Sequence, residues 1–251
     1  MQVDKTTWFI FVCVVVTIML SVTGFKNPSS TPQSAQQSLR TIPQLSHEEA
    51  IRRYPIADLE EPEPTDAAKR AVLKERRVRN NDQTFSEPSN EDDAIGWFPE
   101  RDSDFPALPT NESDFILVGQ VLSAKAHRSE NKRSIFSEFE VRVDEVLKGR
   151  DPRINDQSVI TVERTGGFLR YPNGRKVLFF VQGYGMPEVG ARNVLFLKIA
   201  GQGFRIVTIY ELNPAGVLPL DSGGKFQRFQ GENEAAFLNT LRESITNARP
   251  Q

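Results

Sequence analysis

A long uncharged run near the start of the chain constrains the location and the fold of the residues that follow it. Residues 6–25 contain no charged side chain and no proline. As an α-helix, twenty residues extend about 30 Å, which is the thickness of the hydrocarbon core of a bilayer. Trp8 stands near one end of the run, where indole rings prefer the membrane interface. We therefore expect residues 1–25 to form an N-terminal membrane segment, with the rest of the chain outside the cytoplasm.

Two fates of this segment are open, a retained anchor and a cleaved signal. A signal peptidase site prefers small residues in an Ala-x-Ala-like pattern, and residues 21–24 match that pattern only loosely. The apolar run is also long for a signal peptide. The sequence therefore favours a single-pass membrane protein with an extracytoplasmic C-terminal domain, anchored to the membrane by its N-terminal helix. Secretion after signal cleavage is the alternative.

The cysteine content decides how an exported domain of this chain must be stabilised. Cys13 is the one cysteine, and it lies inside the apolar run. No intramolecular disulfide can form, and no thiolate nucleophile exists outside the membrane segment. The domain that follows must therefore depend on the packing of its apolar core.

Residues 26–102 have the composition of a spacer, rich in Pro, Ser, Gln, Asn and Glu, with 11 basic and 15 acidic residues. Such a stretch buries too little apolar surface to offset the entropy lost on ordering, so we expect it to be largely disordered. Two short helices are predicted within it, one after the capping box at residues 46–49 and one capped by Thr65-Asp66. The second helix carries a basic cluster that we interpret as a solvated face: Lys74, Arg76, Arg77 and Arg79.

Residues 103–251 have the pattern of a β-domain. Between residues 135 and 144, apolar and polar side chains alternate with the period of two that places one strand face in a core and the other in water. Strands are expected at residues 114–126, 135–144, 159–164, 168–171, 177–181, 193–200, 203–210 and 217–220. A helix from about residue 232 closes the chain, and one stripe of it is apolar: Phe237, Leu238, Leu241 and Ile245. This succession predicts a mainly β fold, an antiparallel meander closed into a barrel with a C-terminal helix.

Three motifs of this domain resemble those of uncharacterised exported bacterial proteins whose β-barrel is similar to the OB-type fold of tissue inhibitors of metalloproteinases. The motifs are residues 113–121, residues 139–149, and Gly166-Gly167 followed by residues 194–197. The resemblance implies an OB-like barrel and an extracytoplasmic location. It does not imply inhibition of metalloproteases, because that family uses an N-terminal cysteine and disulfides that this domain lacks.

No residues stand out as a catalytic, metal or cofactor site. A zinc site needs about four ligands at set spacings, and His127 is the one histidine after residue 47. We interpret His127 as a solvated loop residue. Glu138 and Glu140 share one strand face, as the polar side of any half-buried strand does. The sequence therefore predicts a protein that is not an enzyme and that carries no cofactor.

One stretch has a composition typical of recognition surfaces. Basic and aromatic residues alternate around the turn at residues 172–174, where they could stack on sugars or contact polyanions. The candidate binding residues are Arg164, Phe168, Arg170, Tyr171, Arg175 and Lys176. The domain itself is nearly neutral, with 19 basic and 17 acidic residues from position 103, so nucleic acid is not an expected partner.

These observations together favour an extracytoplasmic module that binds an unknown protein or envelope polymer without catalysis. Two alternatives are open, a structural subunit of an envelope assembly and a hydrolase that uses scattered carboxylates.

Overall fold

The computed structural model of the chain describes residues 46–82, 95–98 and 105–248. The predicted membrane segment lies outside these residues. Within the part of the chain that is described, no helix is both long enough and apolar enough to cross a bilayer. The helices are α1 (His47–Arg52), α2 (Ala67–Arg79), η1 (Asn80–Asp82), α3 (Gly224–Gln227) and α4 (Glu234–Asn247). The strands are β1 (Ile56–Asp58), β2 (Ile95–Phe98), β3 (Phe115–Arg128), β4 (Ile135–Lys148), β5 (Val159–Thr165), β6 (Gly167–Arg170), β7 (Lys176–Val181), β8 (Arg192–Ala200), β9 (Gly203–Asn213) and β10 (Gly216–Pro219).

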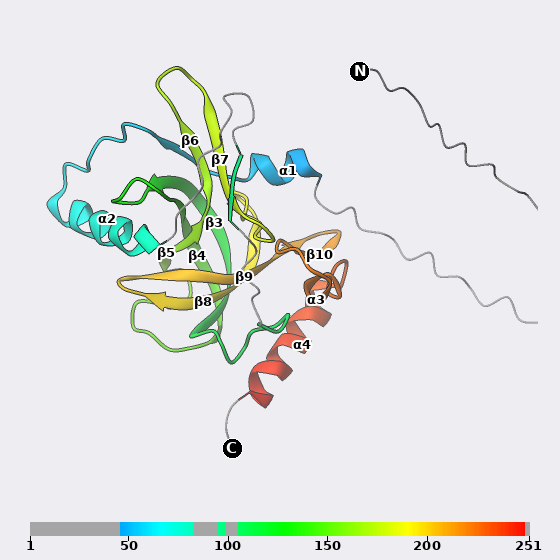
Figure 1. Cartoon of the computed structure of the whole chain (residues 1–251). Helices are drawn as coiled ribbons and strands as arrows, with labels where there is room; N and C mark the ends of the chain where they lie inside the picture. The colour runs from blue at the N-terminus through cyan, green and yellow to red at the C-terminus, as the bar shows by residue number, and fades with distance from the viewer. Residues whose placement is uncertain (1–45, 83–94, 99–104, 249–251) are drawn as a thin grey trace, which may run out of the picture. The chain divides into compact units, whose positions relative to one another are not determined.

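A six-stranded sheet in the order β10-β9-β5-β4-β3-β8 forms the centre of the fold (Figure 1). Because β8 also pairs with β9, five of these strands run almost completely around a ring. The pairs are antiparallel except for a short parallel contact between β5 and β9, where Val162 lies opposite Phe204 and Glu163 opposite Arg205. The predicted mainly β fold, with an antiparallel sheet nearly closed into a ring, is confirmed.

The long strand β3 bends to pair with β4 on one side and β8 on the other. Its pairing with β4 shifts register at three places, between Ile116 and Leu117, between Val118 and Gly119, and between Val121 and Ser123. Such bulges increase the local twist and let one strand turn a corner of a barrel. Gly119 sits at this bend because a Cβ there would lie 2.6 Å from Val141 Cγ1 and 2.7 Å from the Arg142 carbonyl oxygen.

The ring encloses an apolar core to which every one of its strands contributes. In β4 the alternation follows the prediction, with Phe139, Val141 and Val143 buried and Glu140 exposed. Phe136 departs from it, because the residue expected to face water is fully buried. The core residues of the ring strands are Phe115, Leu117, Val121, Phe139, Val141, Val143, Ile160, Val162, Leu195, Leu197, Phe204, Ile206 and Ile209.

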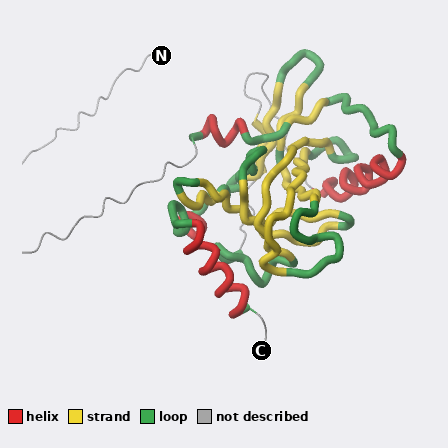
Figure 2. Tube along the Cα trace, turned by 180° about the vertical axis from the view of Figure 1, so that it is seen from behind, coloured by secondary structure: helices red, strands yellow, loops and turns green. Residues whose placement is uncertain are grey.

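Helix α4 covers the outer face of β3, β8, β9 and β10. Asn233 caps the helix by accepting a hydrogen bond from the Ala235 amide, as expected for a short polar residue at this position. The predicted apolar stripe is buried in a second core with Tyr210 and Phe196 at its centre. The C-terminal helix of the prediction is therefore confirmed. Figures 1 and 2 show α4 and α2 on different sides of the six-stranded sheet.

A second, four-stranded sheet has the order β1-β6-β7-β2. The predicted hairpin is present as β6 and β7, joined by residues 171–175, with the Tyr171 amide donating to the Arg175 carbonyl. The outer strands β1 and β2 pair in parallel with β6 and β7 and come from residues before position 103, where the sequence placed the start of the folded domain. Both short helices predicted in the spacer are also present, as α1 and α2.

Candidate binding site

Helix α2 presents its basic residues to the outer face of β4 and β5. Asp66 caps the helix by accepting a hydrogen bond from the Lys69 amide at 2.9 Å. Arg76, Arg79 and Asn80 follow at spacings of three and four residues, which place them on one side of the helix. This side meets the glutamates of the sheet, and Arg77 pairs with Glu61 and Glu63 of the preceding segment. The interpretation of the basic cluster as a solvated face is therefore wrong for three of its four residues. Only Lys74 is exposed.

Two outward-facing glutamates of the ring, Glu138 on β4 and Glu163 on β5, receive these arginines. Glu138 and Glu163 lie directly opposite each other in the pairing of the two strands. Arg76 bridges them, with Nη1 at 2.9 Å from Glu138 Oε2 and Nε at 3.3 Å from Glu163 Oε1. Arg79 forms a second ion pair with Glu163, and Asn80 Nδ2 donates to the other carboxylate oxygen. The two carboxylates are therefore joined by guanidinium groups from a separate segment.

Glu163 is almost completely buried, with 1% of its surface exposed. Burial raises its pKa, and the raised value persists although Arg79 and Arg76 favour the charged form. The nearby charge of Glu138 acts in the same direction as burial. The docked helix thus shields this carboxylate from water without fully compensating its charge.

His127, on β3, is buried rather than solvated, which corrects the interpretation made from its charged neighbours in the sequence. It is 4% exposed and packs against Phe136 with ring centroids 5.5 Å apart. Its Nδ1 lies 2.9 Å from Glu61 Oε2, and its Nε2 lies 3.6 Å from Glu138 Oε2. The imidazole therefore lies between Glu61, in the segment before α2, and Glu138 of β4.

Glu61 fastens this preceding segment to the same site. Arg77 Nη2 lies 2.9 Å from one of its oxygens, and Lys125 Nζ lies 2.5 Å from the other. Burial alone would raise the pKa of Glu61, but the hydrogen bonds from His127, Lys125 and Arg77 outweigh burial and lower the pKa to about 2. Glu61 is therefore ionised at every physiological pH.

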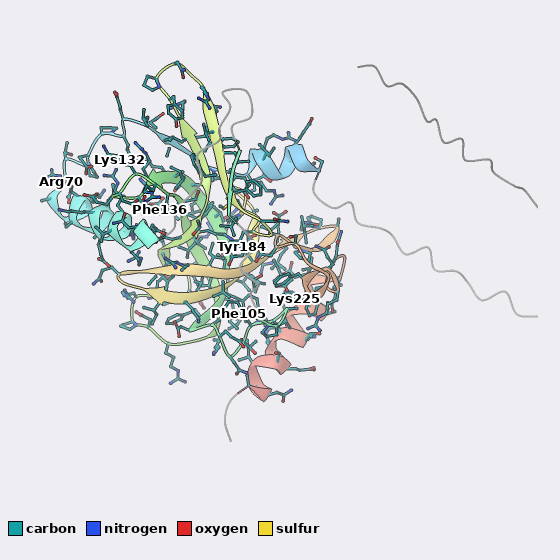
Figure 3. All side chains as sticks on the ribbon, viewed as in Figure 1. Arg70, Phe105, Lys132, Phe136, Tyr184 and Lys225 are labelled. Carbon is teal, nitrogen blue, oxygen red and sulfur yellow. The ribbon has the colours of Figure 1, made fainter. Side chains whose placement is uncertain are left out.

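A polar hollow of about 350 Å³ opens beside this network, between the segment at residues 58–63 and the β3–β4 loop. Lys132 and Phe136, labelled in Figure 3, belong to this loop and the start of β4. The Glu130 amide donates to the Arg77 carbonyl, and Asn131 makes two hydrogen bonds to Asn81, so the loop is joined to α2 and η1. The hollow is lined by Asp58, Leu59, Glu60, Glu61, Glu63, Arg77, Arg128, Ser129, Glu130 and Lys132.

The lowered pKa of Glu61 predicts a specific dependence of stability on pH. Because the folded pKa lies below the ordinary value of 4.5, the contribution of Glu61 is complete above pH 4.5 and is lost as the pH falls towards 2. After allowance for solvent screening, we expect Glu61→Gln to lower the free energy of unfolding by about 2 kcal/mol at pH 7 and by about zero near pH 2.

Urea unfolding of both proteins across this pH range checks the expectation. Glu63→Gln is the matched control, because Glu63 also pairs with Arg77 but its side chain is 54% exposed. Its effect should stay within about 0.5 kcal/mol at all pH values. A loss for Glu61→Gln that is equally large at pH 7 and near pH 2 would contradict this assignment.

The candidate residues from the sequence do not form one surface. Arg164 is buried at 1% exposure and pairs with Asp221 on the opposite side of β5 from Glu163. Phe168 packs against the ring core and contacts Tyr54 edge to face, with centroids 6.4 Å apart. Arg170 is exposed and pairs with Asp58.

The other three candidates lie at the end of the hairpin. Arg175 lies over the ring of Tyr171 at 5.7 Å, whereas Lys176 is exposed and lies opposite Arg170 in the pairing of β6 and β7. Tyr171 also packs against the apolar cluster beneath the hairpin. A binding role for these residues stays a prediction.

The network around α2 was missed because its partners lie far apart in the chain. Glu163 and Arg79 are 84 residues apart, and His127 and Glu61 are 66 residues apart. The sequence contained one relevant feature, because glutamates at outward positions of adjacent strands need cationic partners if another segment covers them. The sequence pattern did not indicate that α2 covers these glutamates.

Among the described residues, no group of three or more His, Cys, Asp or Glu side chains is arranged to hold a metal ion. No family model matches the chain, and no curated protein matches it.

Proposed function

We propose that this chain is a membrane-anchored, extracytoplasmic binding module built on an OB-type barrel, and that it acts without catalysis. The order of the ring strands is the observation that carries the proposal. In chain order the ring strands are β3, β4, β5, β8 and β9. Around the ring each strand pairs with the next in the order β3-β4-β5-β9-β8, and β8 pairs with β3, so the fifth strand lies between the third and the fourth. A parallel contact between the third and fifth strands and an otherwise antiparallel ring are features of OB-type barrels.

The ligand face of such barrels indicates where a partner would bind. OB-type barrels bind ligands on their second and third strands, between the loop that joins the first two strands and the loop that joins the last two. Here these are β4 and β5, the β3–β4 loop and the β8–β9 turn. Helix α2 lies on this face, with its arginines on Glu138 and Glu163 and its Glu75 and Arg79 against Gly201 of the turn.

The charge of this face favours a cationic ligand. Its outward residues on β4 and β5 include Glu138, Glu140 and Glu163, against Arg142 at the far end. A phosphate backbone would be repelled by such a surface, so nucleic acid is disfavoured. A basic protein segment is the complementary partner.

Binding is favoured over catalysis because the ionisable groups at this face are in contact with one another. Glu163 pairs with two arginines, and His127 lies between two carboxylates. A hydrolase needs a carboxylate or an imidazole that is open to substrate and water. The proposed location of the domain outside the cytoplasm is supported by residues 6–25, which are uncharged and long enough to span a bilayer.

One labelling experiment tests both the face and the location. In a Cys13→Ser background, a single cysteine is introduced either at Glu140, which is exposed on the face, or at Glu243, which is exposed on α4. A membrane-impermeant maleimide that carries a photo-crosslinker is then added to intact cells. We expect both positions to be labelled and protein adducts to form from position 140 but not from position 243.

The outcomes separate the two parts of the proposal. Absence of labelling at both positions in intact cells, with labelling after lysis, contradicts the extracytoplasmic location. Labelling at both positions with no adduct from position 140, or with equal adducts from position 243, contradicts the binding face.

A further inference from the structure

Helix α2 is attached to the ring in a different way from α4. Four apolar side chains of α4 are buried, whereas Leu73 is the one buried residue of the fully described helix α2. Its ion pairs with the ring are made by Arg76 and Arg79, and hydrogen bonds join α2 and η1 to the β3–β4 loop. Apolar burial is the main stabilising term in helix docking, and an ion pair removed from water contributes little net free energy. We therefore expect α2 to be held weakly.

The hydrogen bonding of this contact is also incomplete. The Nε atoms of Arg76 and Arg79 and the Oε1 atom of Glu138 are buried without a hydrogen bond. A buried charged group that lacks part of its hydrogen bonding lowers the stability of the docked state.

The departure of α2 would break its hydrogen bonds to the β3–β4 loop but would unpair neither sheet. The strands that flank it in sequence, β1 and β2, pair with β6 and β7 of the four-stranded sheet and not with the ring. Helix α2 itself takes part in no strand pairing. Its departure would expose Glu138, Glu163 and the β4–β5 face.

We propose that the acidic face of β4 and β5 binds an arginine-bearing helical segment of a partner protein, and that α2 occupies this face in cis until the partner displaces it. The ion pairs of Arg76 and Arg79 with Glu138 and Glu163 indicate that the groups of the partner that bind this face are guanidinium groups. The proposal rests on the binding role assigned to this face and adds the class of partner and the means of its regulation. Guanidinium is preferred over ammonium because it can contact two carboxylates at once, as Arg76 does in its ion pairs with Glu138 and Glu163.

The test measures binding of a fluorescent peptide with the sequence of residues 65–82 to the full chain by anisotropy. In the Arg76→Ala/Arg79→Ala variant, α2 loses its hold on the face, and we expect the peptide to bind at least tenfold tighter than to the wild type. Lys69→Ala/Lys74→Ala is the matched control, because it removes two charges from the exposed side of the same helix. It should bind the peptide as the wild type does. Binding to the released variant should weaken as salt is added.

Two further variants keep the result specific. Leu73→Asn loosens α2 without removing any charge and should also increase peptide binding, which covers the case in which the arginine variant does not fold. Glu138→Gln/Glu163→Gln, added to the released variant, should abolish the increase. Equal affinity for the wild type and both released variants overturns the proposal, and so does binding that survives loss of the two glutamates. If adducts still form at position 140 in that case, the face binds a partner of another kind and the proposed function stands.

Discussion

Replacing Arg164 by alanine is expected to lower the free energy of unfolding by about 3–5 kcal/mol, because it leaves a buried carboxylate without its counter-charge. Arg164 and Asp221 are 1% and 3% exposed, and they form an ion pair. Asp221 also accepts hydrogen bonds from Thr208 Oγ1 at 2.8 Å and from the Gly185 amide at 3.1 Å. Burial raises the pKa of Asp221, and its partners oppose that rise. Urea unfolding at pH 7 measures the loss.

Two comparisons show whether the loss arises from the unpaired charge. Arg170→Ala removes an arginine from the exposed pair with Asp58, so its effect should stay below about 1 kcal/mol. Arg164→Met/Asp221→Leu removes both charges and should be less destabilising than Arg164→Ala alone. A loss below about 1 kcal/mol for Arg164→Ala would show that Asp221 is not buried with its charge.

Replacing Phe237 by alanine is expected to cost about 3–5 kcal/mol, the usual range for truncating a fully buried aromatic side chain. Phe237 has no exposed surface, and its ring lies 5.0 Å from that of Tyr210 and 5.3 Å from that of Phe229. The change would leave a cavity between α4 and the outer face of the sheet. Thermal and urea unfolding both report it.

The control for this prediction lies on the same helix. Glu243 is exposed on α4, and Glu243→Ala should change the free energy of unfolding by no more than about 0.5 kcal/mol. If Phe237→Ala proves as mild as this control, α4 is not docked on the sheet through its apolar stripe.

The strands and the last helix could be predicted because their signals are local. The alternation in β4 and the stripe on α4 each report which face of a single element is buried, and both were confirmed. Phe136 breaks the alternation because it lies on the face of β4 that carries Glu138, where its ring packs against that of His127 and is buried. The pattern of residues within one strand does not show which other elements cover that strand.

The site could not be predicted because its charges are paired across the fold. Arginines on a polar helix and glutamates on a strand surface are each typical of solvated faces, and only the docking of α2 brings Arg76 to Glu138 and Glu163. The pairing of Arg164 could not be predicted for the same reason. Its neighbours in the sequence place it near the hairpin, but its partner Asp221 lies 57 residues away.

The distance between α2 and the rest of the domain shows most directly whether Arg76 and Arg79 hold the β4–β5 face closed. Spin labels on cysteines at Lys74 of α2 and Glu243 of α4, in a Cys13→Ser chain, report that distance by pulsed electron paramagnetic resonance. With α2 held on the β4–β5 face by its arginines, the wild type should give one narrow distance distribution. The Arg76→Ala/Arg79→Ala variant should give a broad distribution. A narrow distribution that is the same in both proteins would contradict the claim that these arginines hold the face closed.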